Sequence, residues 1–192
     1  MNFTLDVLDW KPWIAAVPLE ACSEAQLAVL DASNRSARQS QYYLTLVHDA
    51  PALMERSLLF NAVMYGTKGL SRAEREFATV VESRINGCPY CASVHARLFV
   101  QLAKDLPTME GLLADGPAAP MPARLRAIAD YAAALTTTPP SATAAHVAAL
   151  REVGLSDLEI ADATHAVAMF AWANRLMQTL GEPFLPAAPD AA

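Results

Sequence analysis

The segment 76–95 constrains the fold most, because it holds a helix end, a tight break and a new helix start within 20 residues. Ser71 and Glu74 have the S-x-x-E spacing of a capping box, which predicts a helix start, and the N-G pair before the C-P-Y-C motif predicts the end of that helix. Pro89 suits the first position of a second helix and makes Cys88 its N-cap. The sequence therefore predicts a C-x-x-C motif at the N-terminus of a helix.

Three reactive side chains share one face of this second helix. At ~100° per residue, Cys88, Cys91 and His95 fall within roughly 60° of one another. A thiol in the first turn lies near the positive end of the helix dipole, which favours the thiolate. His95 can take the thiol proton, and Glu76 on the preceding helix can orient His95 or exchange protons with it. This pattern predicts a reactive thiol with a proton relay.

The residues alone leave open which cysteine is the nucleophile. Cys88, as the N-cap, would accept N–H bonds directly and is also a good thiolate. In thioredoxin-type motifs the N-terminal cysteine attacks. The i to i+4 spacing of Cys91 and His95 argues for Cys91, which we favour.

Two alternatives need no reactive thiol. One is a structural metal site with Cys88, Cys91, His95 and Glu76 as ligands, although zinc sites usually draw ligands from separated segments and the chain has no second C-x-x-C or H-x-H cluster. The other is a pair of buried cysteines without chemistry. A C-x-x-C motif in a chain otherwise poor in cysteine is more often a redox pair, so we predict neither a metal nor a cofactor. The βαβ pattern of a thioredoxin-like fold is absent.

The string E-x11-C-x2-C-x3-H resembles the active-site signature of the alkyl hydroperoxide reductase D family, within the carboxymuconolactone decarboxylase superfamily. The flanking L-S-R-A-E-R-E and N-G-C-P-Y-C resemble its peroxidase-related subgroup. The resemblance implies that Cys91 is the peroxidatic thiol, Cys88 its disulfide partner, and His95 with Glu76 a proton relay through water. It also implies a homo-oligomer, a trimer or a hexamer, with active sites near subunit contacts. The chain departs from the best-studied branch at Tyr90, where that branch often has His.

Composition narrows the partners and the location. The chain has 192 residues, 54% of them hydrophobic, a net charge of −6 and no basic cluster, which argues against nucleic acid and anionic membranes as partners. Three cysteines do not form a disulfide framework, so we expect a cytoplasmic protein. The N-terminus lacks a signal-peptide pattern, and the longest apolar run, 166–173, is too short to span a bilayer.

Hydrophobic periodicity predicts an all-α, compact multi-helix bundle of eight or nine helices, with no strand pattern. We expect residues 1–22 to form an extended segment that packs on the body or on a neighbouring subunit, 23–185 to form a single helical domain, and 186–192 to form a disordered tail. Besides the two helices of the motif, the second of which ends near residue 104, helical patterns cover 23–36, 39–47, 51–65, 108–114, 123–135, 141–153 and 156–180. The last helix is expected to be central, because its large apolar residues, Leu158, Val167, Phe170, Trp172, Leu176 and Met177, are spread nearly all round it.

The remaining cysteine and histidines have weaker signals. Cys22 is expected to be a plain buried or capping residue, and His48 lies between helices, where it could face a pocket or solvent. His146 is interpreted as a surface or satisfied helix residue rather than a ligand. His165, alone on an apolar helix, is predicted to be a hydrogen-bonded core residue.

The string G-L-S-x-x-E occurs at 69–74 and again at 154–159. Sliding one copy onto the other puts alanine or leucine (Ala161, Ala173, Leu176 and Leu180) at the positions of Glu76, Cys88, Cys91 and His95. This echo suggests a duplicated helical unit of which one copy keeps the chemistry. A capping solution shared by chance explains it equally well.

These observations favour a cofactor-free, thiol-dependent peroxidase or disulfide reductase that acts on a peroxide and is reset by an outside thiol or a partner protein. One alternative is a dithiol that passes electrons to another peroxidase. Another is a carboxymuconolactone decarboxylase-like enzyme acting on a small lactone, a branch that does not depend on a C-x-x-C pair. A zinc-bound structural module and a non-catalytic interaction protein are the non-enzymatic alternatives.

Overall fold

A computed structural model describes residues 2–187. The elements in chain order are β1 (Asp9–Pro12), α1 (Glu24–Ser33), α2 (Gln41–Leu46), α3 (Ala50–Tyr65), α4 (Arg72–Ile85), α5 (Pro89–Ala103), α6 (Leu106–Asp115), α7 (Ala123–Thr136), α8 (Ala144–Glu152), α9 (Asp157–Leu180) and β2 (Gly181–Phe184). The predicted all-α class is confirmed, and each predicted helix is present with ends shifted by a few residues. Most of the predicted tail 186–192 lies outside the described residues.

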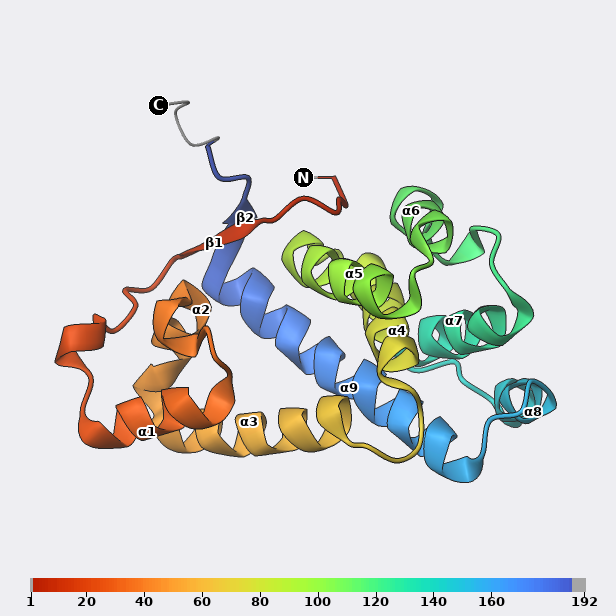
Figure 1. Cartoon of the computed structure of the whole chain (residues 1–192), viewed down its shortest axis with the longest axis horizontal. Helices are drawn as coiled ribbons and strands as arrows, with labels where there is room; N and C mark the ends of the chain where they lie inside the picture. The colour runs from red at the N-terminus through yellow and green to blue at the C-terminus, as the bar shows by residue number, and fades with distance from the viewer. Residues whose placement is uncertain (1, 188–192) are drawn as a thin grey trace.

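Helix α9 runs diagonally through the middle of the molecule, between two groups of helices (Figure 1). On one side α4 packs against α5, α7 and α9 around a buried core that includes Phe77, Phe99 and Ile128. On the other side α1, α2 and α3 form a second cluster, which includes Leu30, Leu53 and both sulfurs of the C-x-x-C motif. The motif therefore lies where the two groups of helices meet.

Reciprocal capping boxes start α4 and α9, as the repeated G-L-S-x-x-E string predicted. The Ser71 hydroxyl accepts the backbone N–H of Glu74, and the Ser156 hydroxyl accepts that of Glu159. The Arg124 guanidinium from α7 joins the two boxes, since it donates to Glu74 at 2.5 Å and to Glu159 at 3.1 Å. The first turns of α4 and α9 are thus joined through one guanidinium that pairs with a glutamate from each.

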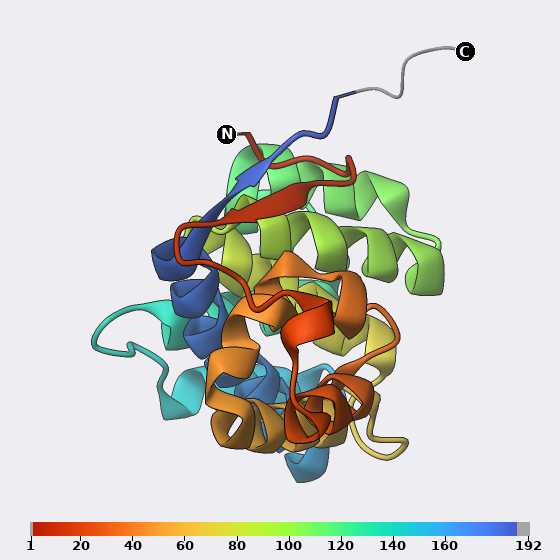
Figure 2. The same cartoon turned by 90° about the vertical axis from the view of Figure 1, so that its left-hand side faces the viewer.

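A short antiparallel ribbon, β1 with β2, was not predicted from the sequence. It holds part of the N-terminal segment against the C-terminal end of α9, as Figure 2 shows. Trp10 in β1 is 2% exposed, and its Nε1 donates to the carbonyl of Met177 at 3.0 Å. Gly181 lies so close to the Trp10 ring that a Cβ there would collide with it. Four-residue strands that contain Pro12 and Pro183 lack the alternation by which a strand is recognised.

The predicted central position of α9 is confirmed. The prediction for His165 is wrong, because this residue is exposed rather than buried in the core. Leu158 and Trp172 are also exposed, so the central helix is not buried on every side. Its solvent-facing stripe carries apolar residues too, and for that reason periodicity alone could not tell the buried face from the exposed one.

Candidate active site

The turn between α4 and α5 positions the thiols. Helix α4 ends at Ile85, and Gly87 has a φ of +73°, a left-handed conformation that glycine adopts without steric cost. Cys88 is the N-cap of α5, and its Sγ accepts the backbone N–H of Cys91 at 3.5 Å. Pro89 follows at the first helical position, where no N–H is needed.

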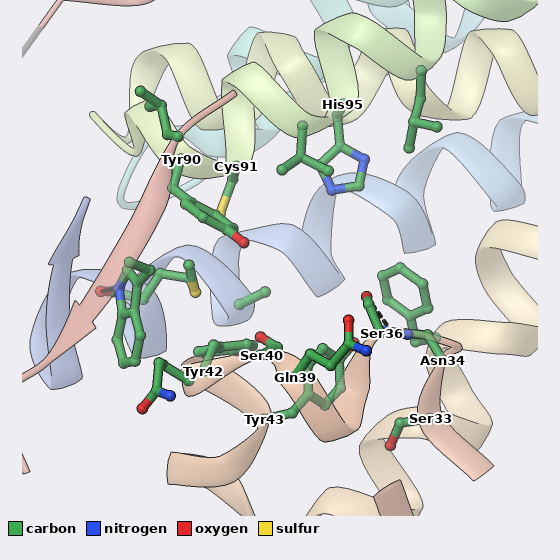
Figure 3. Close-up of a pocket in the computed structure, with 18 of the residues that line it drawn as sticks. Ser33, Asn34, Ser36, Gln39, Ser40, Tyr42, Tyr43, Tyr90, Cys91 and His95 are labelled. Atoms are coloured by element: carbon green, nitrogen blue, oxygen red, sulfur yellow. Dashed lines mark hydrogen bonds between the residues drawn. The ribbon is translucent and has the colours of Figure 1, made fainter. Parts of the chain in front are cut away.

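Both thiols of the motif are free and buried, at 2% exposure for Cys88 and 5% for Cys91. Their Sγ atoms lie 2.8 Å apart. Among the described residues, Cys91 is the cysteine that lines a large cavity, and Figure 3 shows its side chain pointing into that space below α5. Cys88 lies behind it.

The sequence argument for a favoured thiolate at Cys91 is wrong for the resting thiol pair. The hydrogen bond with Cys88, followed by burial and the charge of Cys88, raises the pKa of Cys91 well above its usual value. Arg56 opposes this shift only in part. The helix N-terminus is therefore not enough, and Cys91 needs a base to remove its proton.

A carboxylate–histidine pair lies one turn along α5. Nδ1 of His95 is hydrogen-bonded to Oε2 of Glu76, which is fully buried on α4. Burial tends to raise the pKa of Glu76, but His95 and Arg72 outweigh it, so the pKa is lowered. Since Glu76 is an ionised acceptor, Nδ1–H of His95 donates to it, and Nε2 is the ring nitrogen that Glu76 does not occupy. The His95 ring lines the cavity and meets the edge of Phe170 at 4.4 Å between ring centroids.

No direct hydrogen bond joins Cys91 to His95 in the described part of the chain. Figure 3 shows the two side chains descending from α5 into the same space. Transfer of a proton between them therefore needs a bridging water or the substrate itself.

Arg72 completes the charged group and was not predicted from the sequence. Its guanidinium pairs with Glu76 Oε1 and lies over the Tyr65 ring at 4.0 Å from the ring centroid. The i, i+4 spacing of Arg72 and Glu76 was the available signal. His95 and Arg72 thus pair with the two oxygens of the Glu76 carboxylate, and both lower its pKa.

The cavity has a volume of about 1010 Å³ and lies between α5 and the α1–α3 side of the molecule. Part of its wall is aromatic, from Trp10, Tyr42, Tyr43, Phe60, Tyr65, Tyr90 and Phe170, and another part is polar, from residues between 33 and 41. Burial raises the pKa of Tyr90, so its hydroxyl stays protonated. No sequence pattern indicated that residues of α2 and α3 would face the motif.

The remaining cysteine and histidines lie outside this cavity. Nε2 of His48 donates to the carbonyl of Ala15 at 2.8 Å, and Cys22 is half-buried with its thiol directed at the carbonyl of Pro18. His146 caps α8 together with Thr143. Residues 2–187 contain no cluster of three or more His, Cys, Asp and Glu side chains arranged to hold a metal ion. Nor is any helix in that range both long and apolar enough to cross a membrane.

The chain is similar to known proteins in sequence and in fold. The model of the carboxymuconolactone decarboxylase family matches residues 51–105, which include Glu76, Cys88, Cys91 and His95. A solved structure of an uncharacterized peroxidase-related protein from Silicibacter is 30% identical, with a TM-score of 0.65, over 77% of this chain and 75% of that one. The alkylhydroperoxidase AhpD core structure, from a peroxidase-related protein of Ralstonia eutropha, is 26% identical, with a TM-score of 0.67, over 79% and 86%.

The debrominase Bmp8, in a variant complexed with 2,3,4-tribromopyrrole, has a TM-score of 0.70 over 94% of this chain and 97% of its own, at 16% identity. That likeness concerns the fold. No curated protein matches the sequence.

The helical bundle, with its C-x-x-C motif at a helix start beside a Glu–His pair, defines an alkylhydroperoxidase-like protein. The chain belongs to the carboxymuconolactone decarboxylase superfamily, in the AhpD-like, peroxidase-related subgroup.

Proposed function

We propose that the protein is a cofactor-free, thiol-dependent hydroperoxidase that reduces organic hydroperoxides. The observation that carries the proposal is the shared opening of Cys91 and His95 onto one cavity, with Cys88 Sγ 2.8 Å behind Cys91 Sγ. Cys91 as nucleophile and His95 as base would then face one bound substrate, and the Cys88 thiol would be in contact with Cys91.

In the first step Nε2 of His95 takes the Cys91 proton through a water or through the hydroperoxide. The Cys91 thiolate attacks the terminal peroxide oxygen, an S–O bond forms and the O–O bond breaks. The proton held by His95 passes to the leaving alkoxide, which departs as an alcohol. Cys91 is left as sulfenic acid, and the peroxide has taken two electrons.

In the second step Cys88 attacks the Cys91 sulfur. A disulfide forms, and the sulfenic oxygen leaves as water after taking one proton. An external dithiol or a partner protein then reduces the disulfide and restores both thiols. Glu76 acts on His95 and does not line the cavity, so it is a positioning residue, and Arg72 supports it by pairing with its carboxylate.

We further propose that residues 23–185 form one catalytic domain and that it acts as a homo-oligomer, a trimer or a hexamer, in the cytoplasm. Exposed apolar side chains on the neighbouring helices α3 and α9, namely Leu58, Leu59, Tyr65 and Trp172, support an association surface. A reducing compartment would return the thiol pair to its active form.

The experiment that tests the proposal is the intact mass of the reduced protein before and after one equivalent of cumene hydroperoxide, with free thiols counted in parallel. We expect the loss of two hydrogens and of two thiols, and no such loss in Cys88→Ser or Cys91→Ser. If the hydroperoxide leaves both thiols reduced, but a partner disulfide oxidises them and is itself reduced to two thiols, the protein is an electron-transfer dithiol. If neither reaction occurs, the proposal is wrong.

The second candidate is thiol-dependent removal of bromide from a small aromatic ring. The aromatic cavity walls favour it, together with the shared fold of the debrominase Bmp8. In such a reaction the two thiols supply two electrons, a C–H bond replaces a C–Br bond, and bromide and a disulfide are produced. Release of bromide from a bromopyrrole, without reaction of hydroperoxides, would favour this candidate.

A further inference from the structure

Arg56 is a buried cation that lacks an anionic partner. Its side chain, on α3, is 8% exposed and lines the same cavity as Cys91. Within residues 2–187 no carboxylate lies within ion-pair distance of its guanidinium. Its one hydrogen bond goes to the hydroxyl of Tyr43, at 2.8 Å. A buried cation of this kind is costly unless an anion or ordered solvent completes its contacts.

Two aromatic rings offset part of that cost. The guanidinium carbon of Arg56 lies 4.6 Å from the centroid of the Phe60 ring and 5.2 Å from that of Tyr43. These contacts hold the planar group at the cavity wall but use none of its remaining N–H donors. The group is thus oriented and available for hydrogen bonding.

A second unpaired group lies nearby. The hydroxyl of Tyr42 is buried and has no hydrogen-bond partner, although Tyr42 is only 6% exposed and lines the cavity. The Tyr42 and Tyr43 rings meet edge to face at 5.6 Å between centroids. Figure 3 shows both tyrosines on the wall opposite Cys91. Since buried polar groups are nearly always paired, an unpaired hydroxyl on a residue that lines the cavity points to a missing ligand or to ordered water.

The charge of the cavity contrasts with that of the chain. The protein has a net charge of −6, yet three arginines line the cavity, Arg35, Arg56 and Arg72, and the one lining carboxylate among the described residues is Asp9. Arg72 is occupied by Glu76, and Arg35 is exposed at the edge. Arg56 is the cation that remains for a ligand in the interior.

We propose that the cavity selects organic molecules that bear a carboxylate, with Arg56 as the group that binds it and the Tyr42 hydroxyl as a second donor. The aromatic walls hold the apolar body of the ligand, and the hydroperoxide group then faces Cys91. A phosphate dianion would need more than one unpaired buried cation, so the proposal is for a carboxylate. The proposed selection among hydroperoxide substrates rests on the proposed hydroperoxidase activity. The proposed binding of a carboxylate by Arg56 does not depend on it.

The first test is binding without reaction. Isothermal titration calorimetry would compare 4-isopropylbenzoate with 4-isopropylbenzamide, which has the same shape but no charge. Because hydrogen bonds to charged groups are stronger than neutral ones, we expect wild type to bind the acid about 10-fold to 100-fold more tightly. Arg56→Met should remove the difference, and Arg56→Lys should keep part of it. Arg38→Met, at an exposed ion pair with Asp31, is the matched control and should behave as wild type.

The second test is turnover of cumene hydroperoxide with a para-carboxylate and of its methyl ester. Wild type should have the higher kcat/KM for the acid, and Arg56→Met should lose this preference. An equal fall for both substrates would mean that Arg56 acts on the Cys91 thiol, to which it is electrostatically coupled, and would overturn the proposal.

Equal binding of acid and amide by wild type would also overturn it. Selective binding of the acid without turnover of either hydroperoxide would leave the carboxylate site standing and reject the hydroperoxidase. Circular dichroism and the thermal unfolding midpoint would check that each variant folds. If Arg56→Met does not fold, Arg56→Lys, which should keep part of the preference for the acid, still tests the proposal.

Discussion

The Sγ atoms of Cys88 and Cys91 lie 2.8 Å apart, one behind the cavity wall and the other on it. In the proposed mechanism the two thiols therefore have different roles. Cys91, which lines the cavity, would meet the peroxide, and Cys88, already in contact with it, would close the disulfide without a rearrangement of α5.

The first prediction concerns the two roles. Cys91→Ser should have no reaction with hydroperoxide above background. Cys88→Ser should react once, since Cys91 can still form a sulfenic acid but has no partner to condense with. Serine is itself a good N-cap, so this variant should keep the stability of α5. Stopped-flow kinetics and the mass of a dimedone adduct would measure the single turnover.

If Cys91→Ser forms the sulfenic acid and Cys88→Ser stays unreactive, the order of the two thiols is the reverse. Cys22→Ser provides the control, because Cys22 lies away from the cavity, and it should turn over as wild type does.

The second prediction concerns Glu76. In Glu76→Gln the side chain keeps its shape but cannot act as the anion that holds Nδ1–H of His95. We expect kcat/KM to fall by about 10²-fold or more, the usual contribution of a positioned base. In wild type the pKa of Glu76 is lowered, so loss of its negative charge should reduce activity only at distinctly acidic pH. A profile of kcat/KM against pH measures both effects.

Glu55→Gln, on the exposed face of α3, is the matched control and should leave kcat/KM unchanged. Should Glu76→Gln retain the wild-type value across the pH range, the relay has no role in the rate-limiting chemistry.

The third prediction is a pH effect on stability at Glu82. This α4 carboxyl is fully buried and makes hydrogen bonds with Asn86 and Ser83. Burial raises its pKa from 4.5 to about 8. Between those values the unfolded chain has lost the proton and the folded protein keeps it, so folding takes up a proton. Wild type is therefore most stable below this window and loses stability as the pH rises through it, by at most ~1.4 kcal/mol per pH unit.

Glu82→Gln removes this ionisation. The free energy of unfolding of the variant relative to wild type should thus increase from about pH 5 to about pH 8 and then level off. Urea titrations at several pH values would measure it. A difference that does not depend on pH would contradict a protonated Glu82.

The fourth prediction concerns the N-terminal segment. Trp10→Ala deletes a buried indole and should lower the free energy of unfolding by ~3–5 kcal/mol. Trp10→Phe keeps most of the packing and loses the bond to the Met177 carbonyl, at a cost of about 1 kcal/mol. Trp13→Ala, at 59% exposure, should change stability by less than ~0.5 kcal/mol. Urea denaturation would measure the free energy of unfolding of all three variants. If Trp10→Ala has the free energy of unfolding of wild type, the N-terminal segment does not contribute to the stability of the folded protein.

The local elements of the site could be predicted from the sequence, because their causes lie within a few residues. The S-x-x-E box fixed the start of α4, and Pro89 after Cys88 fixed the start of α5. Helical spacing then brought Cys91 and His95 to the same side of α5, and both line the cavity. Capping and periodicity act over one or two turns, and a sequence displays them directly.

Only the tertiary structure decided what surrounds those residues. Packing of α2 and α3 opposite α5 brought Arg56 and Tyr42 into the cavity, and the β1–β2 ribbon added Trp10 to its wall. Burial among these helices, together with the neighbouring Cys88, raised the pKa of Cys91, where the helix start alone predicted the opposite. Burial and charge pairing depend on segments far apart in the chain, so the sequence by itself determined which groups could react, and the packing decided their protonation and what they can bind.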